Sequence, residues 1–253
     1  MAHLQELLNK TDFYKDIIAS ASDDKKAAQD LNDYFRSEII FNSNSLDGSS
    51  ITLSETRSIL EGNTSKDRKT PLSDVSFYAV TGFSQAYEYM LELSKQDDLT
   101  ITDEIVRKMH LLFYQNTNPV LAGNYRTKKI PASTCGHCPP EPDDLPRLMS
   151  HLGDQILSSQ TTLHPVELAA MAHKRLVDIC PFDAGNLQIA MLLMNLILIR
   201  SGYCTVIIPA SRRDDYQNAL SASRKSIDMN PFSILIAECT IESCMEYCRL
   251  LDM

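Results

Sequence analysis

A short stretch near position 180 combines a thiol, a carboxylate and an amide at the start of a helix. Cys180 precedes Pro181, Asp183 follows, and Gly185 and Asn186 come next. Pro181 cannot continue a helix, and a Gly-Asn pair tolerates the backbone angles of a tight turn. Backbone N–H groups at a helix start receive anions, and a cysteine beside them is driven toward its thiolate form. The stretch therefore offers an anion site next to a candidate base or nucleophile.

Two helices must position this loop. Residues 164–179 predict a helix, because Pro165 suits the first helical turn and apolar residues recur on one face. Residues 187–199 are apolar almost all round, which predicts a buried helix that ends at Ser201 and Gly202. We expect a helix, a short loop and then a buried helix.

The loop resembles the signature of the Fic (Fido) family. That signature reads His-Pro-Phe-x-Asp/Glu-Gly-Asn-Gly-Arg, followed after two residues by a second Arg. The chain keeps Pro181, Phe182, Gly185 and Asn186. The resemblance covers about residues 42–235. It implies a mainly α fold, with a Fic helical core, a small β-hairpin flap and N-terminal helices packed on the core.

Five signature positions differ from the family. Cys180 stands at the catalytic His, Ala184 at the acidic metal ligand, Leu187 at the second Gly, Gln188 at the first Arg and Met191 at the second Arg. Enzymes of the family transfer AMP from ATP to Ser, Thr or Tyr hydroxyls of target proteins. The His acts as base, the acid holds Mg²⁺, and both Arg side chains hold phosphates. A base contributes roughly 10²–10⁴-fold and a charge-stabilising donor about 10²–10³-fold, so the resemblance implies a retained fold with impaired chemistry.

Three substitutes for the lost groups stay open. Cys180 could serve as base or nucleophile, Asp183 could reach a metal, and Gln188 can hydrogen-bond a phosphate without neutralising it. The resemblance places the nucleotide and phosphate loop at Phe182, Asp183, Gly185, Asn186 and Gln188. ATP and Mg²⁺ are cofactors by resemblance only, and we assign no metal site.

A second stretch resembles the inhibitory segment of many Fic proteins, whose pattern is Ser/Thr-x-x-x-Glu-Gly/Asn. The matching residues are Ser43, Asp47 and Gly48, and the acid is one methylene shorter. In the family this acid pairs with the second signature Arg, where the chain has Met191, and blocks productive ATP binding. The alternative is an ordinary turn before a helix.

A third stretch resembles the family's flap. Residues 122–126 read Ala-Gly-Asn-Tyr-Arg and lead toward Pro139 and Pro140. β-prone residues bounded by Gly and Pro predict a short strand pair over 126–138. In Fic proteins this hairpin clamps the backbone of a target by strand addition. The resemblance makes the clamping edge Lys128, Lys129, Ile130, Pro131 and Ala132, and its partner a protein or peptide.

Most other segments are predicted to be helical. Apolar periodicity predicts helices at 4–21, 27–40, 75–93, 102–114, 143–157, 212–223 and 233–251. Thr52 and Glu55 predict a capping box, and His110 is expected to be a satisfied core histidine. We expect a helical N-terminal region at 1–99 with the inhibitory-like segment at about 43–62, a Fic core at 100–225, and a C-terminal helix at 226–253.

Composition narrows the class of protein. The 253 residues are 43% hydrophobic with a net charge of −9, which argues against a nucleic-acid partner. No apolar run is long enough to span a bilayer, and residues 1–10 lack the apolar segment of a signal peptide. We therefore expect a cytoplasmic protein without a membrane partner. The seven cysteines are irregularly spaced, which favours free thiols, and Cys135 and Cys138 form at most half of a zinc site.

Three hypotheses of function follow from these patterns. The first is a Fic-fold pseudoenzyme that binds a protein or peptide at the flap edge and a nucleotide weakly. The second is an active nucleotidyltransferase with altered chemistry that uses Cys180, Asp183, Asn186 and Gln188. The third is a regulatory partner of another Fic protein, with residues 43–47 acting in trans. A homodimer is expected by analogy with the family.

Overall fold

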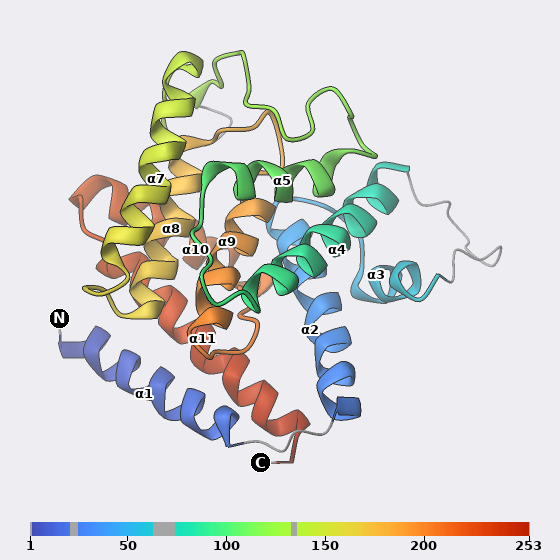
Figure 1. Ribbon diagram of the computed structural model, residues 1–253, viewed down its shortest axis with the longest axis vertical. Coiled ribbons are helices and arrows are strands. Elements are labelled where there is room, and N and C mark those ends of the chain that lie inside the picture. Colours follow the sequence, from blue (N-terminus) through green and yellow to red (C-terminus); the bar gives the residue numbers. More distant parts are fainter. Residues whose placement is uncertain (1, 21–24, 63–73, 133–135, 253) are drawn as a thin grey trace.

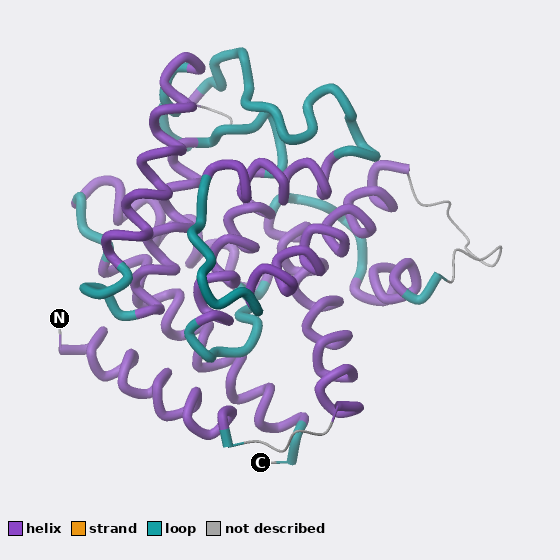
Figure 2. Tube along the Cα trace, viewed as in Figure 1, coloured by secondary structure: helices purple, strands orange, loops and turns teal. Residues whose placement is uncertain are grey.

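Helices joined by loops form the architecture (Figure 1). The computed structural model describes residues 2–20, 25–62, 74–132 and 136–252. Its elements are α1 Ala2–Ala19, α2 Lys25–Leu46, α3 Leu53–Leu60, α4 Asp74–Ser94, α5 Asp103–Tyr114, η1 Pro142–Asp144, α7 Leu145–Ser159, α8 Pro165–Ile179, α9 Asn186–Arg200, η2 Ala210–Arg212, α10 Arg213–Ser226 and α11 Asn230–Leu250. The described residues contain no strand (Figure 2). The mainly α prediction is confirmed.

Helix α9 lies at the centre of the bundle (Figure 1). Every residue from Gln188 to Leu198 is buried, as the apolar sequence of this segment predicts. Helices α2, α4, α5 and α8 all pack against it. The start of α9, and the loop that leads into it, are therefore fixed by four neighbouring helices. None of the described helices is both long and apolar enough to cross a bilayer.

Helix α1 packs along α11 and ties the N-terminus to both ends of the α8–α9 pair (Figure 1). Asp12 accepts hydrogen bonds from Tyr203, after α9, at 2.6 Å and from Lys15 at 2.8 Å, and it faces His164, before α8, at 3.2 Å. Burial of Asp12 opposes ionisation, yet the contacts with Lys15, Tyr203 and His164 lower its pKa to about 2. The N-terminal helix is thus anchored by a charged group.

The small hairpin expected over 126–138 is not formed by the described residues, which follow an irregular path between α5 and α7 (Figure 2). The N–H of Arg126 donates to the Pro181 carbonyl at 2.9 Å, outside any strand pair. Pro131, Pro139 and Pro140 have no N–H to contribute to a ladder. Residues 133–135, including Cys135, lie outside the described part of the chain. The loop is therefore shaped by individual hydrogen bonds and not by strand pairing.

Asn195 is the one polar residue inside the buried stretch 189–198 of α9, and the structure explains it. Its Nδ2 donates to the Val206 carbonyl and to the Met191 carbonyl, both at 3.0 Å, and its Oδ1 accepts from the Val206 N–H at 2.7 Å. The amide thereby satisfies both backbone groups of a fully buried residue in the segment after α9.

We predict that Asn195→Leu lowers the free energy of unfolding by about 2–4 kcal/mol, because it leaves the Val206 N–H and C=O buried without partners. Urea denaturation followed by circular dichroism measures the change. Met194→Leu, a swap of similar volume on the same helix, is the control and should cost less than about 1.5 kcal/mol. Equal stability of Asn195→Leu and the natural protein would contradict this account of Asn195.

Candidate functional site

Two left-handed residues bracket the loop between α8 and α9. Cys180 ends α8 with φ of 48°, and its N–H donates to the Leu176 carbonyl at 2.9 Å. Gly185 precedes α9 with φ of 79°. A Cβ at Gly185 would lie 2.6 Å from Cε1 of Phe113, so both the backbone angle and the space require glycine there. A non-glycine residue in this conformation costs about 1 kcal/mol, so neighbouring groups must hold Cys180 in place.

Arg126 is the group that holds Cys180. It is 2% exposed, and its guanidinium donates to the carbonyls of Cys180 at 2.7 Å, Lys128 at 3.0 Å and Pro140 at 2.6 Å. Its backbone N–H also donates to the Pro181 carbonyl. This one side chain therefore fastens the α8–α9 loop to both ends of the irregular segment expected to be the flap.

Phe182 and Asn186 fix the middle of the loop. The Phe182 ring is fully buried and stacks on the His110 imidazole, with ring centres 3.8 Å apart. The Asn186 amide accepts from the Phe182 N–H at 2.9 Å and donates to the Phe182 carbonyl at 2.8 Å. Asn186 was expected to bind phosphates, but its side chain forms two hydrogen bonds with the backbone of Phe182 and so stabilises the turn.

His110 is a satisfied core histidine, as expected, and it also supports the loop. Its Nδ1 accepts from the Gly123 N–H at 2.9 Å, so Nε2 carries the proton and donates to the Ala184 carbonyl at 3.1 Å. Burial lowers the pKa of His110 to about 4. The supporting role of His110 was not predicted, because only the tertiary fold brings α5 against the loop.

The predicted inhibitory residues reach the start of α9, where the acid meets Gln188. The Nε2 of Gln188 donates to Oδ2 of Asp47 at 3.1 Å and lies 3.4 Å from Oδ1 of Asn44. Met191, expected opposite this acid, is 1% exposed and packs in the core. Oε1 of Gln188 and Nδ2 of Asn44 are buried without a hydrogen-bond partner among the described residues. The contact thus forms three residues before the expected position, at Gln188 and not at Met191, and Asn44, which sequence reasoning missed, belongs to it.

Helix α2 explains this placement. It continues to Leu46, where the Ser/Asn-rich sequence had predicted an end at residue 40 and a turn before the next helix. The Ser43 hydroxyl donates to the Ile39 carbonyl at 2.6 Å within the helix, and Gly48 ends it with φ of 95°. Asp47 therefore leaves from the last turn of α2. The capping box predicted for Thr52 and Glu55 is confirmed at the start of α3.

The electrostatics at the start of α9 are negative and weakly compensated. Asp47 is exposed over the residue as a whole, but its carboxylate lies against Gln188. The partial burial of the carboxylate raises the pKa of Asp47 above the ordinary value. The Gln188 hydrogen bond and the Arg213 charge oppose that shift. Gln188 itself is neutral and 3% exposed. An incoming anion would meet the neutral amide of Gln188 at the first arginine position of the signature, with the Asp47 carboxylate beside it.

The remaining loop residues do not assemble a metal site. Ala184 offers only a methyl group, and its carbonyl already binds His110. Asp183 is exposed, and its charge, together with burial of the tyrosine, raises the pKa of Tyr114. Cys180 is 7% exposed. Within the described ranges no three His, Cys, Asp or Glu side chains group as metal ligands.

The segment expected to bind a target lies on the surface. Lys128, Lys129, Pro131 and Ala132 are exposed, and Ile130 is partly buried. Lys129 pairs with Glu141 at 2.6 Å, a surface ion pair that contributes little to stability. The segment keeps an accessible backbone although it is no strand.

The fold and the loop together define a class of protein: a helical domain whose buried central helix begins at a Pro-Phe-x-x-Gly-Asn turn. Residues 100–198 match the family model of the Fic/DOC family. The chain is 35% identical over 241 residues to a "Protein adenylyltransferase Fic" of Nematostella vectensis, covering 93% of this chain and 54% of the relative. The chain belongs to the Fic/DOC family.

Other relatives agree with this assignment. The Aedes aegypti "Protein adenylyltransferase Fic" is 34% identical over 239 residues, covering 93% of this chain and 46% of that protein. The chain thus spans about half the length of these curated relatives. Among solved structures, Fic-1 from C. elegans superposes with a TM-score of 0.87 at 26% identity, covering 99% of this chain and 73% of that one. A Fic-domain protein of Bacteroides thetaiotaomicron, at 21% identity and a TM-score of 0.81, covers 99% and 98% and shows the same fold.

We predict that the free energy of unfolding falls as the pH drops from about 6.5 to about 4. The folded protein keeps His110 and His173 neutral, each with a pKa of about 4 because of burial, while the unfolded chain takes up these protons near pH 6.5. Their contribution is complete above pH 6.5 and is lost toward pH 4, on the order of 3 kcal/mol per histidine.

Urea denaturation at several pH values measures this dependence. His110→Gln should flatten the curve by about half, because His173 remains. His151→Gln removes an exposed histidine and is the matched control. The carboxylates titrate equally in all variants, so the difference between two curves gives the contribution of the buried histidine to the free energy of unfolding. Curves of His110→Gln and the natural protein that run parallel would refute the assignment.

Proposed function

We propose that this chain is a Fic-domain protein whose adenylyl-transfer site is impaired, and that it acts by binding. The curated relatives are named protein adenylyltransferases, and their cofactors by family resemblance are ATP and Mg²⁺. In this chain the loop keeps its shape through Arg126, Phe182 and Asn186. Four signature groups that would perform the chemistry are replaced. Cys180 stands at the base, Ala184 at the metal ligand, and Gln188 and Met191 at the two arginines.

The hydrogen bond between Gln188 and Asp47 carries this proposal. Phosphates need positive charge or N–H donors, and the amide of Gln188 already donates to Asp47 and Asn44. The orphaned atom of Gln188 is Oε1, an acceptor, which repels phosphate oxygens. The first-turn N–H groups of α9 and the orphaned Nδ2 of Asn44 remain as neutral donors, which supports only weak nucleotide binding.

The other two hypotheses have less support. An altered nucleotidyltransferase would need Asp183 at a metal, yet Asp183 is exposed beside Tyr114. It would also need Cys180 as base, and that residue is buried. A regulator acting in trans would need its inhibitory acid free, whereas Asp47 binds Gln188 of its own chain.

We predict that the natural protein shows no Mg²⁺-dependent binding of ATP, because Gln188 and Met191 carry no charge at the two arginine positions of the signature and Ala184 offers no carboxylate. A restored variant, with Cys180→His, Ala184→Asp, Leu187→Gly, Gln188→Arg and Met191→Arg, should bind at least about 100-fold more tightly, since two charge-assisted contacts contribute roughly 1.5–3 kcal/mol each. Isothermal calorimetry with ATP, with and without Mg²⁺, measures both.

Two further variants sharpen this experiment. Asp47→Ala in the restored background should increase transfer of labelled AMP, because it removes the acid opposite the new arginines. Gln188→Arg alone adds one cation and no base, so it should change binding without producing transfer. Melting curves establish that each variant folds. Clear Mg²⁺-dependent binding by the natural protein would sink the proposal on its own, whatever the variants do.

We further propose that the exposed segment 128–132 binds an extended peptide by backbone hydrogen bonds. The N–H groups of Lys129 and Ile130 donate to no backbone or side-chain acceptor recorded among the described residues. The segment's path already diverges from a closed hairpin, so a peptide could supply the missing pairing. Lys128 and Lys129 favour an acidic peptide.

We predict that Ile130→Pro lowers the affinity for such a peptide by about tenfold, because proline has no backbone N–H and one donor is lost. The probe is a decapeptide selected by phage display against the natural protein and measured by fluorescence anisotropy. Ile130→Val keeps the donor and is the matched control. Selected peptides that bind the Ile130→Pro variant as tightly as the natural protein would show that this edge does not bind by backbone pairing.

A further inference from the structure

A pair of buried thiols lies far from the loop, between the segment after α9 and the last helix. The sulfurs of Cys204 and Cys244 are 3.6 Å apart. Cys204 is 7% exposed and Cys244 is fully buried on α11. They lie 40 positions apart in the chain, so a bond between them would join two separate elements. Nothing in the proposed binding function uses this pair.

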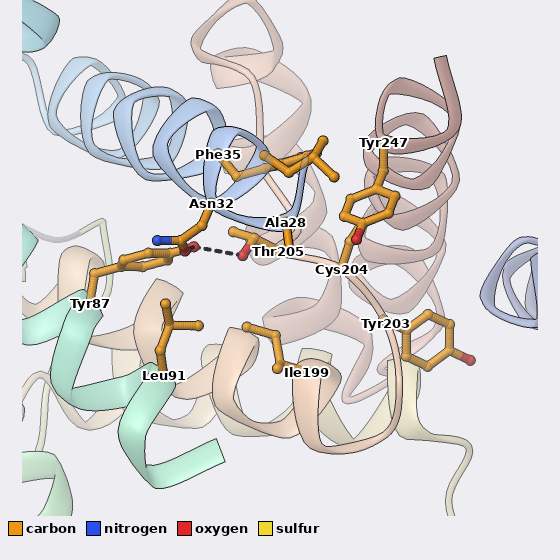
Figure 3. A pocket seen from close by; sticks show the side chains of 11 residues that line it. Ala28, Asn32, Phe35, Tyr87, Leu91, Ile199, Tyr203, Cys204, Thr205 and Tyr247 are labelled. Carbon is orange, nitrogen blue, oxygen red and sulfur yellow. Dashed lines mark hydrogen bonds between the residues drawn. The ribbon is translucent and has the colours of Figure 1, made fainter. Parts of the chain in front are cut away.

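A cavity gives small molecules access to Cys204. It has a volume of about 170 Å³ between α2, α4, the end of α9 and α11, and Cys204 lines its wall (Figure 3). Hydroxyl groups of Tyr87 and Thr205, hydrogen-bonded at 2.9 Å, make part of the wall polar. Ala28, which also lines the cavity, is exposed, so the cavity reaches the surface. A water molecule needs about 30 Å³, so a molecule the size of hydrogen peroxide fits.

The geometry excludes one competing pair, Cys244 with Cys248. Cys248 lies four residues after Cys244 on α11, and residues so spaced in a helix have Cβ atoms about 5–6 Å apart. A disulfide needs Cβ atoms about 3.5–4.5 Å apart, so Cys244 and Cys248 cannot join within an intact helix. Cys204, by contrast, lies outside any helix, with its sulfur 3.6 Å from that of Cys244.

We propose that Cys204 and Cys244 are a redox site that a hydroperoxide converts to a disulfide. The Cys204 sulfur attacks a peroxide oxygen, the O–O bond breaks, and sulfenic acid and water form. The Cys244 sulfur then attacks the sulfenic sulfur, the S–O bond breaks, and a second water leaves. Two thiols are oxidised and one hydrogen peroxide is reduced to two waters. The contact with Cys244, together with burial, raises the pKa of Cys204, whereas the contact with Cys204 lowers the pKa of Cys244. Cys204 is therefore assigned the first attack by its place in the cavity wall, and Cys244 is the thiol that more readily forms a thiolate for the second attack.

The test is to treat the reduced full chain with hydrogen peroxide, block remaining thiols with N-ethylmaleimide, digest, and map the peptides by mass spectrometry. The expected product joins the peptides of Cys204 and Cys244 and lacks the mass of two hydrogens. The melting temperature should rise by about 5–10 °C, because the bond closes a long loop, and dithiothreitol should reverse the rise.

Variants separate this site from general oxidation. Cys204→Ala should abolish the linked peptide and the melting shift, whereas Cys248→Ala and Cys180→Ala should keep both. Ala28→Leu enlarges a side chain at the cavity's exposed edge and should slow oxidation about threefold or more. Oxidation of Cys204 to sulfinic acid without a link, or a link that pairs other cysteines, would overturn the proposal. The mapping of the natural protein decides this even if a variant fails to fold.

Discussion

The site depends on one buried cation, Arg126, whose guanidinium contacts no carboxylate among the described residues. The Arg126 guanidinium is almost fully buried, and it is compensated by three carbonyl groups. Removing a charge from water costs several kcal/mol, so those carbonyls must be presented in good geometry. Two of them belong to the ends of the segment after α5, and the third belongs to Cys180. The backbone of the loop is therefore constrained by Arg126, and this constraint does not involve the side chain at position 180.

That independence explains how the fold can persist while side chains of the signature differ from those of the family. Phe182, Gly185 and Asn186 act on the backbone through stacking, steric need and hydrogen bonds. These are the residues that match the family signature. The replaced positions, 180, 184, 188 and 191, are those whose side chains would touch a nucleotide or a metal in the family. Selection for the shape of the loop alone would keep Phe182, Gly185 and Asn186, and it would allow substitutions at the other four positions.

Much of the fold could be predicted because its signals are local. The apolar sequence of α9, Pro165 at the start of α8 and the capping box at Thr52 each specify an element without knowledge of the rest. The predicted end of α2 was wrong because Asn and Ser, which occupy positions 42–45, are typical of turns. In the structure Ser43 and Asn44 are buried, and the helix continues through them to Leu46. The pairing of Asp47 with Gln188 could not be predicted, since it depends on how far α2 extends past the start of α9.

The Asp47–Gln188 contact also shows the effect of replacing a charged partner with a neutral one while an acid still reaches the start of α9. An acid from α2 still reaches the first turn of α9, but a neutral amide replaces the cation expected in the family, so the contact loses its Coulombic attraction. A carboxylate that is partly buried without a full counter-charge is destabilised, which is why the pKa of Asp47 rises. The contact therefore contributes little to stability.

Arg126 also couples the two surfaces on which the proposed function depends. The same guanidinium binds Lys128, next to the exposed edge, and Cys180, at the start of the loop. A peptide that pairs with the edge would pull on the Lys128 carbonyl, and a shift there changes the geometry available to the Cys180 carbonyl. Because a buried guanidinium tolerates no lost acceptor, the two carbonyls must move together or not at all. The proposed binding at the edge would therefore be transmitted to the loop through a single residue, Arg126.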